Sequence, residues 1–133
     1  MAETALHIPG LKAAADLSAA QYRAVQLSAA MTVNLITNGN AQIPIGVLQN
    51  DPDAASEAAE VIALGASMVE AGASFSAGDS LVCDNSGRLI TGAFEAAIGT
   101  ADLYVVGRAL EAAGAAGDYM RAWLGVFVPG SAE

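Results

Sequence analysis

Positive charge is scarce in this chain of 133 residues. Five Lys and Arg residues stand against 14 Asp and Glu residues, and the formal net charge at pH 7 is −9. Proteins that bind nucleic acid use a basic face to displace counterions from the phosphates, and an anionic membrane surface attracts basic residues in the same way. The composition therefore predicts that neither nucleic acid nor a membrane is a partner.

Cysteine and histidine occur once each, as Cys83 and His7. One cysteine cannot form a disulfide within the chain, and the two residues cannot fill the four positions of a structural zinc site. We interpret Cys83 as a small strand residue, and His7 as an exposed or contact residue rather than a positioned base. Glycine-rich phosphate-binding motifs are also missing. The sequence thus predicts no catalytic residue, no metal site and no cofactor, and so no enzyme.

Long apolar runs are missing as well, since nothing approaches the roughly 20 residues that a membrane span requires. The first residues, Met-Ala-Glu-Thr, carry no basic run that would open a secretory signal. We therefore expect a soluble protein made in a cytoplasm. Aromatic residues are only 5% of the chain, and much of the 54% hydrophobic fraction is alanine, which adds little apolar area. The expected core of this one domain is thin, which leaves room for burial shared with other subunits.

An internal echo is the most informative feature that is present. Residues 45–49 (Ile-Gly-Val-Leu-Gln) precede a small polar loop and then residues 60–65 (Glu-Val-Ile-Ala-Leu-Gly). About sixty residues later, 106–111 (Val-Gly-Arg-Ala-Leu-Glu) and 119–125 (Tyr-Met-Arg-Ala-Trp-Leu-Gly) flank a similar loop. Each copy reads as strand, loop, strand. Two copies of one hairpin favour a small all-β body.

Other segments support the same fold class. The sequence Asp-Asn-Ser-Gly at 84–87, between the apolar runs 80–83 and 88–91, is typical of a hairpin turn. Strands are also predicted at 31–37, 42–50 and 68–71, and long loops at 72–78 and 93–103. Pro44 lacks a backbone donor, so its strand should begin at a sheet edge or at a bulge. Short strands with turns between them indicate a small β-barrel or sandwich.

Two segments carry conflicting signals. Ser-Ala-Ala-Gln at 18–21 has the form of a helix capping box, yet residues 22–28 alternate as a strand does. A turn followed by a strand reconciles the two. Alanine-rich residues 51–59 favour a short helix by propensity, but Gly65 and the β-branched Val61 and Ile62 follow. By analogy with the second hairpin we predict a loop there.

The chain divides into three parts on this interpretation. Residues 1–17 read as an extended N-terminal arm, with a Pro-Gly turn signal and apolar residues without a period. Such an arm is either frayed or ordered along a neighbouring molecule. Residues 18–128 form a single β domain, and residues 129–133 form a C-terminal tail. Within the arm, Ile8, Pro9 and Leu11 are candidate contact residues for a neighbouring molecule.

The last predicted strand has two contrasting faces. Tyr119, Arg121 and Trp123 alternate onto one of them, and the other holds Met120, Ala122 and Leu124. One face must belong to the core, and a core position is the ordinary expectation for a tryptophan. The Tyr-Arg-Trp face, however, has the composition of an interface patch. Tyr119, Arg121 and Trp123 are therefore further candidate interface residues.

The charged side chains outside the last strand are expected mainly to stabilise loops, turns and strand pairs. Asp51 with Asp53, and Glu57 with Glu60, indicate a solvated acidic loop, with a weak cation site as the alternative. Asp79 and Asp84 are expected to stabilise turns. The three arginines on predicted strands could pair across the sheet or across a subunit interface; they are Arg88, Arg108 and Arg121.

Several segments, taken in order, resemble small capsid cement or decoration proteins of tailed bacteriophages. They are 21–27 (Gln-Tyr-Arg-Ala-Val-Gln-Leu), 44–50 (Pro-Ile-Gly-Val-Leu-Gln-Asn), 77–79 (Ala-Gly-Asp), 84–87 and 105–111 (Val-Val-Gly-Arg-Ala-Leu-Glu). Their order and spacing, across roughly residues 16–126, carry the resemblance. It implies a compact barrel-like or tulip-like β fold with no catalytic residues.

The resemblance also implies a function. Such proteins bind the outside of an icosahedral shell, commonly as homotrimers, and brace neighbouring major capsid proteins against internal pressure. We therefore expect a virion structural protein on the outer capsid surface, with the major capsid protein and its own copies as partners. A net negative surface suits this place outside enclosed nucleic acid. The rival hypothesis is a β module that binds a small ligand or glycan, with Trp123 stacking on a sugar.

Overall fold

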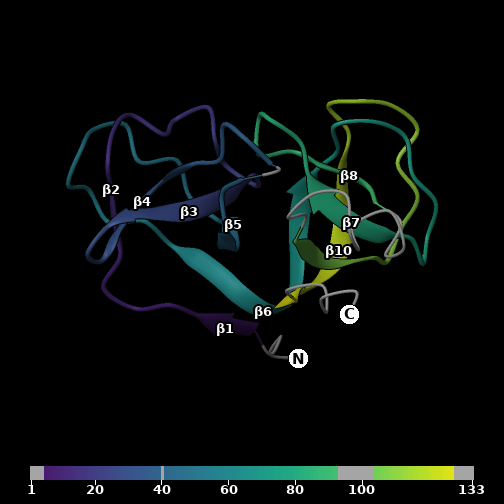
Figure 1. Cartoon of the computed structure of the whole chain (residues 1–133), viewed down its shortest axis with the longest axis horizontal. Coiled ribbons are helices and arrows are strands. Elements are labelled where there is room, and N and C mark those ends of the chain that lie inside the picture. The colour runs from purple at the N-terminus through teal and green to yellow at the C-terminus, as the bar shows by residue number, and fades with distance from the viewer. Residues whose placement is uncertain (1–4, 40, 93–103, 128–133) are drawn as a thin grey trace.

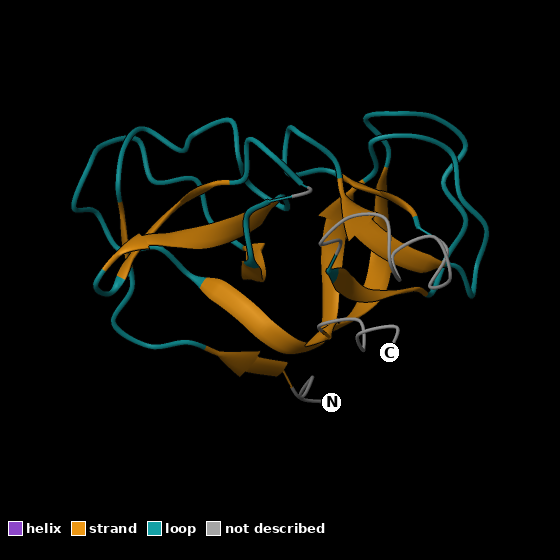
Figure 2. Cartoon of the chain, viewed as in Figure 1, coloured by secondary structure: helices purple, strands orange, loops and turns teal. Residues whose placement is uncertain are grey.

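The computed structural model describes residues 5–39, 41–92 and 104–127, and within these ranges the chain forms strands and loops without a helix (Figure 2). The predicted all-β class is confirmed. The strands are β1 (Ala5–His7), β2 (Lys12–Ala13), β3 (Ala24–Ala29), β4 (Thr32–Leu35), β5 (Pro44–Leu48), β6 (Val61–Glu70), β7 (Ser80–Cys83), β8 (Leu89–Thr91), β9 (Val105–Ala109) and β10 (Tyr119–Phe127).

All ten strands belong to one open sheet, in the order β2-β4-β3-β5-β6-β10-β9-β7-β8, with β1 beside β6. Only the pair of β2 and β4 is parallel among the named strand pairs of the described residues. The long strand β6 runs between two groups of strands, with β2 to β5 on one side and β7 to β10 on the other (Figure 1). The barrel, tulip-like or sandwich form stays a prediction.

Local sequence signals account for most of these strands. The turn at 84–87 joins β7 to β8 as predicted, with Cys83 opposite Leu89. Pro44 begins β5 at an irregularity in its pairing with β3, opposite Gln26, so the bulge alternative is the correct one. Residues 51–59 form a loop without a helix, as predicted. The predicted loop at 93–103 lies outside the described residues.

One strand was predicted in two pieces. Residues 60–65 and 68–71 were read as separate strands, but β6 is continuous over ten residues. Gly65 lies in its middle with a positive φ of 116°, and it is paired on both sides, with Ala5 of β1 and Leu124 of β10. Because β1 and β10 pair with Gly65 from both sides, β6 continues through this glycine, although its sequence signal predicted the end of a strand.

The internal echo is a repeated hairpin. β5 pairs with β6, and β9 pairs with β10, both antiparallel. The first glycine of each copy does the same work: a Cβ on Gly46 would meet the backbone oxygen of Ile62, and a Cβ on Gly107 that of Trp123. The two hairpins are joined through β6 and β10. The sequence repeat therefore corresponds to a repeated structure, in which β5 and β9 need a glycine where the backbone of the partner strand approaches closely.

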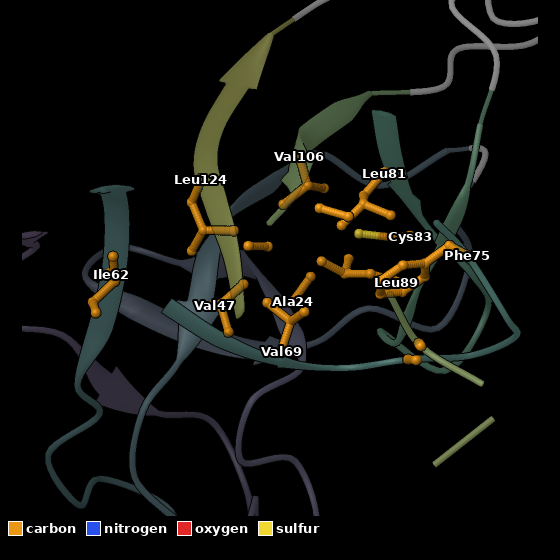
Figure 3. Packing of buried hydrophobic residues seen from close by; sticks show 14 of the residues in the cluster. Ala24, Val47, Ile62, Val69, Phe75, Leu81, Cys83, Leu89, Val106 and Leu124 are labelled. Atoms are coloured by element: carbon orange, nitrogen blue, oxygen red, sulfur yellow. The ribbon is translucent and has the colours of Figure 1, made fainter. Parts of the chain in front are cut away.

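Both faces of the sheet are buried in the first group of strands. Successive residues of a strand point to opposite faces, and here consecutive apolar pairs enter two different clusters. The pairs are Ala24 and Val25 on β3, Val47 and Leu48 on β5, and Val61 and Ile62 on β6, of which Ala24, Val47 and Ile62 join the first cluster. Figure 3 shows the first cluster, to which β7, β9 and β10 also contribute. The thin core expected from composition is thus split in two.

The N-terminal segment covers the second cluster. Leu11 is 4% exposed and Leu17 is 4% exposed, and both lie in this cluster beside Val25 and Val33. β1 pairs with β6, and β2 pairs with β4. The described part of the expected arm, from Ala5 onward, therefore lies along the body of its own chain. The division into arm, domain and tail stays a prediction, and residues 128–133 lie outside the described ranges.

A buried carboxylate joins the two groups of strands. The Glu70 side chain, at the end of β6, is 8% exposed and accepts hydrogen bonds from Arg23 Nε at 3.0 Å and Arg23 Nη2 at 3.3 Å. Arg88 Nη1 lies 3.6 Å from Glu70 Oε2, the oxygen that also accepts from Arg23 Nη2, and Arg88 Nε lies 3.8 Å from Asp84 Oδ2. Arg23 precedes β3 and Arg88 precedes β8. One carboxylate thus holds cations from both groups.

Substituting the repeat glycines tests the close approach. Gly46→Ala and Gly107→Ala should each lower the free energy of unfolding by about 2 kcal/mol, because the new methyl group meets backbone that cannot rotate away. Urea denaturation followed by circular dichroism measures this. Gly114→Ala is the control, since its Cβ would meet only Asp118 Oδ2 at 3.5 Å. Equal effects at all three positions would contradict the interpretation.

A second substitution tests the buried ion cluster. Glu70→Gln should lower the free energy of unfolding by about 3 kcal/mol, because it leaves the partly buried guanidinium of Arg23 without a counter-charge and that of Arg88 with only Asp84, at 3.8 Å. The matched control is Glu111→Gln, since Glu111 pairs with Arg121 at 4.0 Å with both side chains at least half exposed. The control should change stability by less than about 0.5 kcal/mol. A loss at Glu111 as large as that at Glu70 would refute the role of burial.

Candidate functional site

The two faces of β10 have opposite environments. Tyr119 is 52% exposed, Trp123 is 51% exposed, and the Arg121 side chain is 64% exposed. Ala122 and Leu124, which alternate with them, are fully buried. The ordinary expectation of a core tryptophan is therefore wrong. The Tyr-Arg-Trp side of the strand is the outer one.

Strand pairing places further apolar side chains on this outer side. Directly opposite residues of an antiparallel pair share a face, and Met68 of β6 lies opposite Arg121. Leu6 of β1 lies opposite Leu64 of β6. Leu110, just after β9, donates its N–H to the carbonyl oxygen of Arg121 at 3.0 Å. We call the resulting surface the apolar face; its large side chains are Leu6, Leu64, Met68, Leu110, Tyr119 and Trp123, between 37% and 57% exposed.

The six large side chains of the apolar face adjoin one another, which distinguishes them from isolated exposed residues. Isolated apolar side chains are common on protein surfaces, whereas several on adjoining strands mark an interaction site or a ligand-binding surface. Tyr119 and Trp123 were predicted from the sequence, and the other four were not. The signal was present in the alternation of Leu64, Ala66 and Met68, but it was hidden when β6 was divided at Gly65.

Two of the five cationic residues lie on the same side. Arg108 lies opposite Trp123 in the pairing of β9 with β10 and is exposed. Its side chain has no hydrogen bond or ion pair to any of the described residues. Arg121 pairs only weakly, with Glu111 at 4.0 Å. The apolar face therefore carries positive charge on a protein that is otherwise acidic.

One end of the apolar face is fixed by the buried ion cluster. Tyr119 lies opposite Glu70 across the β6–β10 pair. Its ring meets that of Tyr22 edge to face, with centroids 5.7 Å apart and an interplanar angle of 75°. Tyr22 holds a positive φ of 67°, and its carbonyl oxygen accepts the Glu70 N–H at 2.9 Å. Tyr119 is thus positioned by an ordered neighbour while half of it stays exposed.

The candidate residues of the N-terminal segment do not join this surface. Ile8 is partly buried against the second cluster, Leu11 is buried inside it, and Pro9 is exposed in the turn between them. Leu6 is the residue of this segment that reaches the apolar face. An interface role of Ile8, Pro9 and Leu11 stays a prediction, and Leu11 has no surface to offer in this conformation.

The remaining polar groups serve local structure. Asp79 and Asp84 accept backbone N–H groups in their turns, as predicted: Ser76 donates to Asp79, and Ser86 and Arg88 donate to Asp84. In the acidic loop between β5 and β6, Glu57 accepts the N–H of Asp53 at 2.9 Å. Among the described residues, no three His, Cys, Asp or Glu side chains are placed to hold a metal ion.

Cys83 is a free, buried cysteine. Burial raises the pKa of the Cys83 thiol to about 12, and the neighbouring Asp84 carboxylate adds to the rise. A thiol that stays protonated is a poor nucleophile, which fits the interpretation of Cys83 as a strand residue.

In the part of the chain that the structure describes, no helix is long and apolar enough to cross a bilayer.

Comparison with known proteins places the fold. No protein-family model matches the chain, and no curated protein matches it in sequence. Among solved structures, the chain is similar to the N base of the head fiber gp8.5 of bacteriophage phi29. The TM-score is 0.63, the sequence identity is 18%, and the alignment covers 99% of each chain. The two chains share a fold along their full lengths.

Neighbouring substitutions on β10 test which face is outer. Leu124→Ala should lower the free energy of unfolding by about 3 kcal/mol, because it empties a fully buried position. Trp123→Ser, one residue earlier, should change it by less than about 1 kcal/mol at a protein concentration where the chain is monomeric. Thermal or urea unfolding of both variants provides the measurement. The reverse order of effects would show that Trp123 belongs to the core.

Proposed function

We propose that this chain is a structural protein of a bacteriophage virion, which decorates the outer surface of the capsid and stabilises it by bridging major capsid protein subunits. The observation that carries the proposal is the shared fold, which extends over 99% of this chain and 99% of the phage head fiber base. The motifs that resemble phage cement proteins point the same way. The chain acts without catalysis, cofactor or metal.

The physical properties support a binding role. The apolar face has the residue types that anchor protein interfaces. Tyr119 and Trp123 lie among apolar neighbours, with Arg108 and Arg121 beside them. The chain is acidic overall, at −9, and so suits a position outside the shell rather than on the enclosed nucleic acid. Its partners are the major capsid protein and its own copies, in a homotrimer, with neither nucleic acid nor a membrane.

The mechanism is avidity. A trimer that touches several capsid subunits raises the effective concentration for its second and third contacts. Weak individual contacts then add up to firm retention without any tight single site. Neighbouring capsid proteins that are held by one trimer resist being forced apart.

The rival function is binding of a small ligand or glycan, and the exposure of Trp123 is the observation that favours it. Sugar stacking needs an open aromatic ring with polar groups beside it. On this surface Trp123 lies opposite Ala66 on one side and Arg108 on the other, and apart from Arg108 and Arg121 the large exposed side chains named there are apolar or aromatic. This composition suits a protein partner better than a hydrated sugar.

Co-sedimentation with capsids that lack this protein tests the proposal. The chain should pellet with capsids at a fixed stoichiometry and should raise the temperature at which the shells open in a light-scattering or dye-release assay. Pelleting without capsids measures the background, and an unrelated acidic protein of similar size is the control for trapping. No binding, together with quenching of Trp123 fluorescence by soluble oligosaccharides, would replace the proposal with its rival.

A further inference from the structure

We infer that the apolar face binds a second copy of this chain, in a head-to-tail contact that closes into a ring. The inference rests on the proposed function, which includes a homotrimer but leaves open which surface joins the copies. It assigns that role to the sheet surface of β1, β6, β10 and β9. The surfaces outside the apolar face and outside the acidic surface that it meets on the next copy are then free for the capsid.

Charge selects the partner. Arg23 and Arg88 are committed to Glu70 inside the molecule, whereas Arg108 has no partner among the described residues and Arg121 has only a weak one. Two bodies of −9 repel each other, and cations at their contact reduce that repulsion. A second copy is an acidic partner by its own composition. Arg108 and Arg121 thus lie where contact between two acidic copies requires them.

The same charges select a head-to-tail geometry. A two-fold contact would place the apolar faces of both copies against each other, so that each copy would bring Arg108 and Arg121 to the same contact. A head-to-tail contact instead sets the arginines of one copy on the acidic surface of the next. The acidic loop between β5 and β6, with Asp51, Asp53, Glu57 and Glu60 all exposed, belongs to that surface. Such contacts form closed rings when the rotation allows it.

Among the described residues, one stretch of strand edge beside the apolar face has no paired strand. Gly65 of β6 pairs with Leu124 of β10 and with Ala5 of β1, so these two strands take opposite edges of β6. Within the described ranges, the pairing of β1 extends along its edge to Gly65, and no strand pairs there before Glu70, whose N–H donates to Tyr22. We call this stretch the open edge. N–H groups two residues apart in a strand point to the same edge. The N–H groups of Ala66 and Met68 therefore face this open edge.

The open edge would give the contact a direction. Backbone groups at a strand edge readily accept a partner chain. Those of Ala66 and Met68, which have no strand partner within the described ranges, lie beside the apolar side chains of Leu64 and Met68, where apolar burial would hold a second copy. Protection of the Ala66 and Met68 amides is thus a local readout of association, independent of any substitution.

The test measures the mass of the full chain over a range of concentrations by sedimentation equilibrium, with matched pairs of variants. Trp123→Ser and Leu64→Ser should weaken association roughly thirtyfold or more, as expected for interface anchors. Leu27→Ser is the control, because Leu27 is 51% exposed on β3, outside the apolar face. Arg108→Glu should weaken association and Lys12→Glu should not. Near-ultraviolet circular dichroism verifies that each variant is folded.

Each outcome decides the matter. A closed trimer or larger ring that face variants dissociate and control variants leave intact supports the inference, as does slower hydrogen exchange at Ala66 and Met68 in the assembled state. A monomer at all concentrations, a dimer, or equal effects of face and control variants overturns it. Capsid co-sedimentation is scored separately. A chain that stays monomeric yet binds capsids supports the proposed function and contradicts this inference. A ring that does not bind capsids supports the inference and contradicts the proposed function.

Discussion

The carboxylate of Glu70 joins parts of the sheet that strand pairing leaves far apart. Arg23 belongs to the branch that ends in β2, and Arg88 to the branch that ends in β8. The turn before β8 follows the same path: Gly87 accepts the N–H of Ala24 at 2.7 Å, and Asn85 accepts that of Gly39 at 2.9 Å. An open sheet is thereby held in a bent form, and Tyr119 of β10, which lies opposite Glu70, is held with it.

The placement of large side chains follows from this frame. Among the aromatic side chains that the structure describes, only Phe75 is buried. The core is filled mainly by Val, Leu, Ile and Ala from strands buried on both faces, and the largest apolar group of the chain, Trp123, lies outside. Of the other aromatic side chains that the structure describes, Tyr119 and Trp123 are exposed, and Tyr22 and Tyr104 are half-buried. This distribution is expected of a subunit whose apolar burial is completed by a partner.

The strand content and the two hairpins were predictable because their signals are local: the turn residues at 84–87, the repeated glycines and the alternating apolar residues. What could not be predicted depends on contacts between distant segments. β6 continues through Gly65 because β1 and β10 pair with it, and Leu11 is buried because β3 and β4 present an apolar second face to it. The outer position of Trp123 was undecided for the same reason, since alternation fixes which residues share a face but not which face is covered.

The second cluster has a consequence for how the molecule is made. Every one of its buried members lies between Leu11 and Val61, whereas the first cluster needs residues as late as Leu124. Domains and parts of domains can fold in the order in which the ribosome releases them. The first half of this chain can therefore shield apolar groups while the second half is still being translated. What remains exposed during synthesis is the first cluster's side of β3, β5 and β6, which waits for the later strands.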